Sequence, residues 1–184
     1  MVLHTRTVTV EQFFAFITEP ENAGRRFELI AGEIVQTVGS GYASRVAARI
    51  VRYVDEFVDE HDLGTVTTAD GGYMIAGHPY IPDVAYMSSA RQSRPEYREG
   101  YNVLAPDLAV EVLSSGNTES QITTKVVNYL RAGSIVWLVD PELQKISIYA
   151  PGSDPYTLTE FDTLTGGEAL PGFSVPVEKL FPPR

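Results

Sequence analysis

Cysteine is absent from this 184-residue chain. Neither a disulfide framework nor a thiolate metal site can therefore form. Long apolar runs are also missing: no stretch approaches the roughly twenty apolar residues of a membrane-spanning helix, and the first residues contain no apolar segment typical of a signal peptide. A cytoplasmic location, without attachment to a membrane, is the expectation from these absences.

Positive charge is scarce as well. The chain has 14 Lys and Arg residues against 24 Asp and Glu residues, which gives a formal net charge of −10 at pH 7. Tight, non-specific binding of nucleic acid depends on neutralising phosphates, so this overall charge argues against it. A local basic face, or a set of carboxylates that recruits a divalent cation, remains compatible with the composition.

The spacing of apolar residues predicts the secondary structure. Helices are predicted over residues 10–19, 43–60 and 118–131, where an apolar stripe at helical spacing or a capping residue marks the segment. A hairpin is predicted around Ala31 and Gly32, and further strands are predicted over 64–75, 80–87, 107–113, 134–140 and 145–150. Residues 89–104 are polar and irregular, and we expect a long loop there.

A central mixed β-sheet flanked by helices accommodates this order of elements, so the predicted fold class is α/β, in the broader α+β sense. We expect one domain over residues 1–184, with a helix and hairpin in 1–40, the core in 41–150 and a Gly- and Pro-rich extension in 151–184. The strand at 145–150 follows a short turn and is expected at a sheet edge, where pairing with a second copy would give a homodimer.

Glu111 interrupts the segment LAVEVL at 108–113, which is otherwise typical of a buried central strand. An ionised carboxylate is costly to bury without a partner. Asp83 is a second acid among apolar residues, and the two carboxylates converge if their predicted strands pair. A divalent cation such as Mg²⁺ or Mn²⁺ would relieve their repulsion. Alternatively, Asp83 caps the turn after Pro82 and Glu111 pairs with an arginine.

Lys125 lies in the predicted helix that follows the Glu111 strand, and no other lysine precedes Lys145. It borders the buried stripe of that helix, three residues after Ile122 and four before Tyr129. We therefore expect its ammonium group to reach the end of the sheet near Glu111, where it would orient a metal-bound water or stabilise a developing charge. The alternative is a surface lysine whose charged end extends into water.

Pro82-Asp83, Glu111-Val112-Leu113 and the downstream lysine together resemble the PD-(D/E)XK nuclease superfamily. More closely, EVLSSGNT at 111–118, Lys125 and YLRAGSIVWLVDP at 129–141 resemble a bacterial branch of restriction-endonuclease-like proteins. FELIAGEIV at 27–35 and LPGFSVPVEKLF at 170–181 also fit, so the likeness covers nearly the whole chain. It implies a restriction-endonuclease-like core in which Asp83 and Glu111 bind Mg²⁺ or Mn²⁺ and Lys125 assists attack of water on a phosphodiester bond of DNA.

This chain departs from the pattern of the resemblance at three places. The superfamily lysine usually lies two residues after the glutamate, where Leu113 stands here. Many members of the branch have an acid four residues before the lysine, where this chain has Gln121, and a histidine at the start of the long helix, where it reads GYASRV at 41–46. Gln121 either completes a capping box with Thr118 or faces the metal.

Glu28 also matches the branch pattern, and it either supplies a third acid to the site or pairs with Arg25 or Arg26. Contacts with nucleic acid are expected from a basic stripe at helical spacing and from arginines of the long loop; these residues are Arg45, Arg49 and Arg52 in the helix and Arg91, Arg94 and Arg98 in the loop. Alternatively, these arginines are solvated surface charges that do not contact nucleic acid.

Divalent-metal-dependent hydrolysis of phosphodiester bonds in nucleic acid is the favoured function, as a DNA endonuclease by resemblance. The alternative is a nuclease-fold protein with weakened catalysis that acts as a nucleic-acid- or protein-binding module, which the changes at Gln121 and at the histidine position favour. A third interpretation is that the acids have only structural roles and that the chain has no catalytic or metal-binding site.

Overall fold

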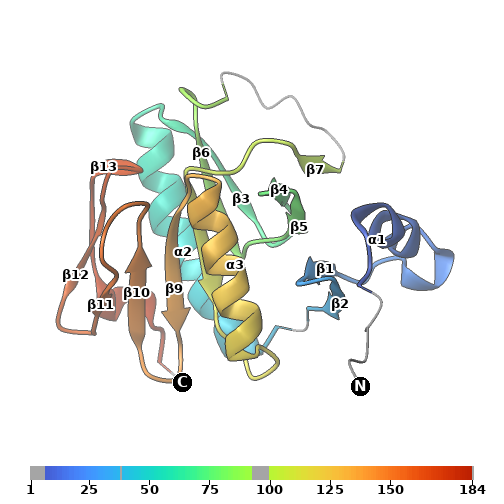
Figure 1. Cartoon of the computed structure of the whole chain (residues 1–184). Helices are drawn as coiled ribbons and strands as arrows, with labels where there is room; N and C mark the ends of the chain where they lie inside the picture. The colour runs from blue at the N-terminus through green and yellow to red at the C-terminus, as the bar shows by residue number, and fades with distance from the viewer. Residues whose placement is uncertain (1–6, 38, 93–99, 184) are drawn as a thin grey trace.

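A mixed six-stranded β-sheet forms the centre of the protein, with helices on both faces (Figure 1). The computed structural model describes residues 7–37, 39–92 and 100–183. In spatial order the sheet contains β11 (Tyr156–Leu158), β10 (Lys145–Tyr149), β9 (Ile135–Asp140), β8 (Leu108–Val112), β6 (Val84–Ser88) and β3 (Gly64–Thr68). Strands β8 and β9 run parallel, and the other neighbouring pairs are antiparallel. The predicted fold class is confirmed.

The two long helices, α2 (Gly41–Glu60) and α3 (Glu119–Arg131), cover opposite faces of this sheet (Figure 1). Successive strand residues point to opposite faces. In β8, Leu108 and Val110 therefore pack in the core beneath α2, whereas Ala109 packs with Val126 of α3. Glu111 has the same parity as Ala109, so its carboxylate points toward α3.

Capping residues set the starts of the helices. Thr9 caps α1 (Val10–Ile17) and Thr118 caps α3, each in a capping box with the glutamine three residues later, Gln12 and Gln121. Ser40 caps α2 by accepting a hydrogen bond from the Ala43 amide at 3.0 Å. All three predicted helices are confirmed, with boundaries that differ by at most a few residues.

The predicted hairpin consists of β1 (Phe27–Ile30) and β2 (Glu33–Gln36). Its two turn residues, Ala31 and Gly32, both have positive φ angles, 52° and 81°. This is the turn geometry that matches the right-handed twist of the strands. The short 3-10 helix η1 (Pro20–Asn22) connects α1 to the hairpin.

Two expectations about the middle of the chain are wrong in detail. The segment 64–75 forms two strands, β3 and β4 (Gly72–Ile75), and a further strand, β5 (His78–Tyr80), lies mostly in the gap between the predicted strands 64–75 and 80–87. The 89–104 loop contains the short strand β7 (Tyr101–Asn102), which joins β4 and β5 in a small sheet. Its residues 93–99 lie outside the described part of the chain.

The strand at 145–150 is not an edge strand, which corrects the basis of the predicted homodimer. It is β10, and it pairs with β9 on one side and β11 on the other. The C-terminal elements β12 (Thr163–Gly166), β13 (Leu170–Pro176) and η2 (Val177–Leu180) pack in the same core as α2. The division of a single domain into residues 1–40, 41–150 and 151–184 stays a prediction. Among the residues that the structure describes, none of the helices is long and apolar enough to cross a membrane.

Candidate active site

Glu111 lies in the middle of a buried hydrogen-bond network. Its side chain is 6% exposed, and each carboxylate oxygen accepts one hydrogen bond from α3. Lys125 Nζ donates to Oε2 at 2.6 Å, and the Tyr129 hydroxyl donates to Oε1 at 2.7 Å. Burial raises the pKa of Glu111 to about 7, against the attraction of Lys125. The arginine partner considered for Glu111 is thus replaced by a lysine and a tyrosine.

Lys125 joins two carboxylates that are far apart in the sequence. Besides Glu111, its ammonium group contacts both oxygens of Glu28, at 2.9 and 3.1 Å. The residue is 3% exposed, so the alternative of a lysine that extends into water is wrong. Burial alone would lower the pKa of Lys125, but the two carboxylates raise it above its ordinary value. Lys125 is therefore a buried cation in a carboxylate environment.

Glu28 reaches this network from the hairpin. It is buried in β1 and also accepts a hydrogen bond from the Ile81 amide at 2.8 Å. The alternative partners of Glu28 are bound elsewhere: Arg25 donates to Asn22 and Gln36, and Arg26 forms an ion pair with Asp70. The carboxylate of Glu28 therefore lies with the other acids and is not paired with Arg25 or Arg26.

Asp83 lies at the bend just before β6, next to the end of β8. The β6–β8 register pairs Val84 with Val110, which brings Asp83 level with Glu111. The Val112 amide donates to Asp83 Oδ2 at 2.7 Å. Burial raises the pKa of this carboxyl above its ordinary value, although the Val112 amide and Lys125 act in the opposite direction. The predicted pairing of the two strands is confirmed.

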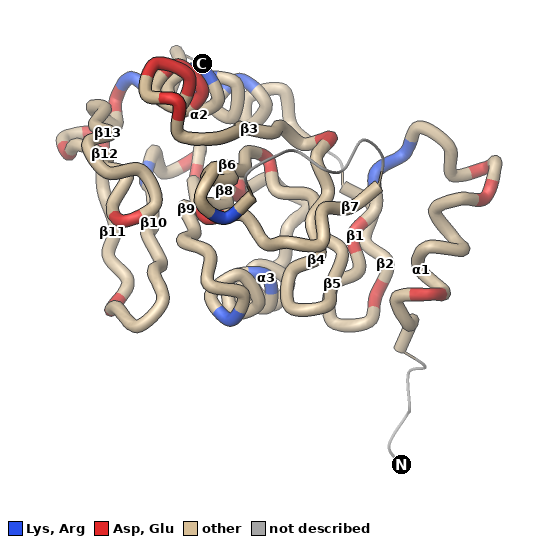
Figure 2. The backbone as a smooth tube through the Cα atoms, turned by 90° about the horizontal axis from the view of Figure 1, so that it is seen from above, with Lys and Arg blue, Asp and Glu red and all other residues tan. Residues whose placement is uncertain are grey.

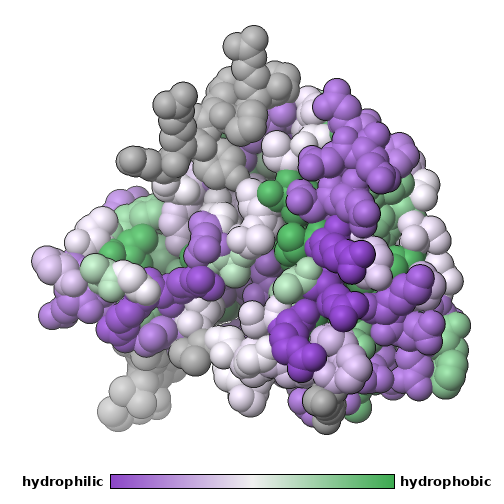
Figure 3. Space-filling model, turned by 180° about the vertical axis from the view of Figure 1, so that it is seen from behind, coloured by the Kyte–Doolittle hydropathy of each residue, from purple (hydrophilic) through white to green (hydrophobic). Residues whose placement is uncertain are grey.

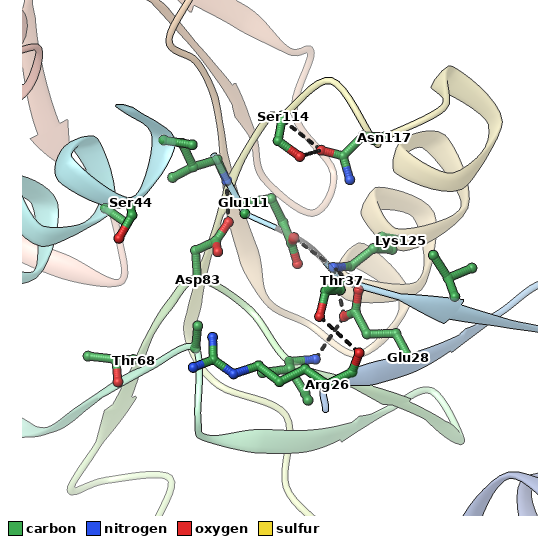
Figure 4. A pocket seen from close by; sticks show the side chains of 18 of the residues that line it. Arg26, Glu28, Thr37, Ser44, Thr68, Asp83, Glu111, Ser114, Asn117 and Lys125 are labelled. Carbon is green, nitrogen blue, oxygen red and sulfur yellow. Dashed lines mark hydrogen bonds and ion pairs between the residues drawn. The ribbon is translucent and has the colours of Figure 1, made fainter. Parts of the chain in front are cut away.

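A cavity of about 590 Å³ gives access to this network. Its walls come from the hairpin, the first half of α2, the β3–β4 turn, the segment after β8 and the start of α3 (Figure 4). Figure 3 shows the corresponding hollow between the part formed by α1 and the hairpin and the part that contains α2. Asp83, Glu111, Glu28 and Lys125 all line the cavity.

Gln121 also lines the cavity, but its side chain caps the start of α3. Its Oε1 accepts a hydrogen bond from the Thr118 amide at 3.1 Å, while Thr118 Oγ1 accepts from the Gln121 amide at 3.3 Å. The capping-box interpretation is confirmed. The resemblance implies an acid at this position in many members of the branch, whereas in this chain the side chain belongs to a helix cap.

The basic stripe of α2 runs beside the cavity. Arg45 and Arg52 are exposed and Arg49 is half-buried, and within the described part of the chain none of them forms an ion pair. Ala48 lines both the cavity and the shallow hollow bordered by the three arginines. Figure 2 shows that α2 carries basic positions first and acidic positions toward its C-terminal end.

The expected loop cluster of arginines is not supported. Arg91 forms an ion pair with Asp107 at 2.9 Å and donates hydrogen bonds to the Ala105 and Gly133 carbonyls. Arg94 and Arg98 lie outside the described residues. Arg91 thus connects the end of β6 to the segments that flank β8 and α3.

The sequence profile of a family named Uma2, described as "Putative restriction endonuclease", matches residues 10–178. The chain belongs to the Uma2 family. Its fold is similar to that of a crystal structure described as "a putative nuclease belonging to DUF820" from Anabaena variabilis, with a TM-score of 0.82, 21% identity and coverage of 95% of this chain and 97% of that chain. No curated protein matches. The Uma2 membership supports a nuclease-like function for the chain, and the match to the crystal structure shows that the fold is shared.

The donor atoms in this Uma2 protein fit a small divalent cation. Among the described residues, no group of three or more His, Asp or Glu side chains is arranged to hold a metal ion. Asp83 and Glu111 nevertheless supply two carboxylates, and Mg²⁺ is commonly held by one or two carboxylates while it keeps several waters. Burial disfavours the ionised form of both acids, so a cation between them would stabilise both. Asp83 and Glu111 are therefore the residues beside the cavity that could hold a divalent cation.

Two further residues belong to this Uma2 site and were not among the predicted ones. Tyr129 donates to Glu111, and it lies one helical turn after Lys125, so the shared face of α3 is a signal that predicts it. Arg26 lines the cavity, but it had been considered only as a partner for Glu28. Its position depends on the β3–β4 turn, which contributes Asp70, and the sequence carries no signal for that contact.

Proposed function

We propose that this Uma2 protein hydrolyses phosphodiester bonds of nucleic acid, with DNA as its substrate, in a reaction that depends on Mg²⁺ or Mn²⁺. The observation that carries the proposal is the grouping of Asp83, Glu111 and Lys125 at one wall of the cavity. A buried acid and a half-buried acid with raised pKa values, together with a buried cation, are costly to keep in a fold unless they have a function. Membership of the Uma2 family supports the same reaction class.

Each residue has a separate role in the proposed reaction. Asp83 and Glu111 hold the cation, which when bound polarises the phosphate and lowers the pKa of a water molecule. Lys125 fixes the orientation of Glu111 through its 2.6 Å contact, and its positive charge favours the ionised form of both acids that would hold the cation. Glu28 holds Lys125 from the opposite side. Gln121 keeps the start of α3 in place at the cavity wall.

The DNA backbone beyond the reacting phosphate would follow α2. Arg45, Arg49 and Arg52 lie beside the cavity and would contact phosphates on the flank of the reacting one. A homodimer would allow cleavage of both strands of a duplex. The edge strands of the central sheet are β11 and β3, not β10, and Tyr156 on β11 is 51% exposed.

One observation favours the second candidate, a nuclease-fold protein that binds nucleic acid or another protein without cutting. The resemblance implies an acid at position 121 in many members of the branch, whereas this chain has Gln121 there and uses its side chain in the helix cap. A site with fewer acids holds a metal ion less tightly. The two candidates therefore differ in turnover, which only the first predicts.

Cleavage of supercoiled plasmid with Mn²⁺ tests the proposal. Asp83→Asn and Glu111→Gln each remove one ligand charge with little change in shape, and we expect each to lower the cleavage rate at least about 100-fold. Asp55→Asn and Glu56→Gln, both on exposed positions of α2, are the matched controls and should cut like the wild type. Cleavage that survives both ligand substitutions would disprove the site. Mn²⁺ binding that depends on Asp83, without any cleavage, would favour the second candidate.

A further inference from the structure

Arg26 stands out among the charged residues that line the cavity. Within the described residues, that lining contains four carboxylates and two cations, Arg26 and Lys125. A phosphodiester that enters this cavity meets an excess of negative charge. Even with a divalent cation bound, the phosphate needs a further positive group to offset its own charge.

Lys125 cannot serve this purpose without leaving its present partners. Its ammonium group has three N–H donors, and it contacts both oxygens of Glu28 and one oxygen of Glu111. It is also almost fully buried, at 3% exposure. The positive charge of Lys125 is thus already compensated by two carboxylates.

Arg26 differs from Lys125 both in how many of its N–H donors are engaged and in its exposure to water. Its guanidinium has five N–H donors and forms a single ion pair, from Nη2 to Asp70 Oδ1 at 3.0 Å. Both side chains of this pair are open to water, with 51% of Arg26 and 79% of Asp70 exposed. An ion pair this exposed contributes little stability, so an incoming anion replaces Asp70 easily.

The hairpin holds Arg26 toward the cavity. The Arg26 carbonyl accepts hydrogen bonds from the Thr37 amide at 3.0 Å and from Thr37 Oγ1 at 3.4 Å. Arg26 precedes Glu28 by two residues, so both side chains leave the strand on the same side. Figure 4 shows the Arg26 side chain along the cavity wall, with its guanidinium directed toward Thr68 and Asp83.

Arg26 shares the cavity with the proposed metal ligands. Arg26 and Asp83 line the same cavity, and Figure 4 shows the guanidinium on the side of the cavity where the Asp83 carboxylate lies. A phosphate bound between Asp83 and Arg26 would have a metal ion on one side and a guanidinium on the other.

We propose that Arg26 binds a phosphate oxygen of the nucleic-acid substrate, and that its ion pair with Asp70 is the resting position that the phosphate replaces. The planar guanidinium forms two parallel hydrogen bonds with a phosphate, which a lysine does not. This inference rests on the proposed function because it names the residue that positions the substrate of that site. It makes Arg26 a phosphate-binding residue in the cavity.

Binding of a short fluorescein-labelled DNA duplex, followed by anisotropy in Ca²⁺ over a series of salt concentrations, tests this inference. Arg26→Gln should weaken binding about tenfold and lower the slope of log Kd against log salt by about one, because one phosphate contact is lost. Arg26→Lys should retain most of the salt slope but bind less tightly than the wild type. Asp70→Asn should bind at least as tightly as the wild type.

Arg25→Gln is the matched control. It removes the same charge from the adjacent residue, whose side chain bonds Asn22 and Gln36 and does not line the cavity. Equal effects of Arg25→Gln and Arg26→Gln would overturn the inference, as would a wild type that binds no duplex. Because this measurement does not require cleavage, Arg26-dependent binding by a protein that never cuts would contradict only the proposed hydrolysis. Cleavage by the wild type with equal binding of both variants would contradict only the role of Arg26.

Discussion

Glu111 illustrates how a carboxylate is retained inside an apolar strand. The residues around it, Val110 and Val112, point to the opposite face of the sheet and pack beneath α2. Its own face meets α3, where Lys125 and Tyr129 donate one hydrogen bond to each carboxylate oxygen. Charge-assisted hydrogen bonds offset part of the cost of burial, but the pKa near 7 means that the ionised form is still disfavoured.

The raised pKa of Glu111 predicts a pH-dependent metal affinity. A metal ligand must be deprotonated, and Glu111 holds its proton up to about pH 7. Below this value the apparent Mn²⁺ affinity should fall about tenfold per pH unit, and above it the affinity should level off. Calorimetric titration with Mn²⁺ at a series of pH values measures this dependence. Glu111→Gln should bind weakly with a flatter profile, and a wild-type affinity that is the same at pH 6 and pH 8 would contradict the prediction.

At the scale of elements, α3 carries Lys125 and Tyr129, and its start is set by the Thr118–Gln121 capping box. Thr118→Ala should lower the free energy of unfolding by about 1 kcal/mol, because the Gln121 amide loses its acceptor. Thermal unfolding followed by circular dichroism should show a midpoint lower by about 2–4 °C. Thr124→Ala is the control, since that hydroxyl only bonds the Ser120 carbonyl one turn earlier, and it should leave the midpoint unchanged or raise it. Equal midpoints for Thr118→Ala and the wild type would exclude a stabilising cap.

The elements themselves differ in how far the sequence predicts them. Helix α2 follows from a regular apolar stripe, and the hairpin follows from the alternation of apolar and polar residues around Gly32, which tolerates a positive φ angle. Strand β5 was missed because Gly77 and Pro79 are typical of a break. Pro79 is tolerated there since it stands on an outer strand of the small sheet. The position of β10 inside the sheet depends on β11, a three-residue strand within a Gly- and Pro-rich segment that gives no strand signal.

The candidate site was predictable only where local spacing carries the information. Asp83, Glu111 and Lys125 stand out as charged residues in apolar segments, so the sequence identifies them. The contact between Glu28 and Lys125 joins residues 97 positions apart, and only the folded hairpin brings them together. The Arg26–Asp70 pair likewise depends on how the hairpin faces the β3–β4 turn, which no periodicity in the sequence determines.

At the scale of the whole molecule, a net charge of −10 coexists with a basic stripe beside the cavity. Arg49→Gln should weaken DNA binding and lower the slope of log Kd against log salt by about one. Arg131→Gln removes the same charge from the exposed end of α3 and should leave the slope unchanged. Anisotropy titrations of both variants measure the difference. Equal slopes for the two variants would indicate that the stripe acts only through the overall charge.

The central claim is that Asp83 and Glu111 together hold a divalent cation at the cavity wall. A crystal structure of the protein grown with Mn²⁺, with anomalous data that identify the manganese, tests this claim most directly. The account predicts an anomalous peak within about 2.2 Å of an oxygen of each acid, and no such peak in Asp83→Asn crystals. A wild-type crystal with manganese bound elsewhere, or with no anomalous peak between the two carboxylates at saturating Mn²⁺, would contradict it.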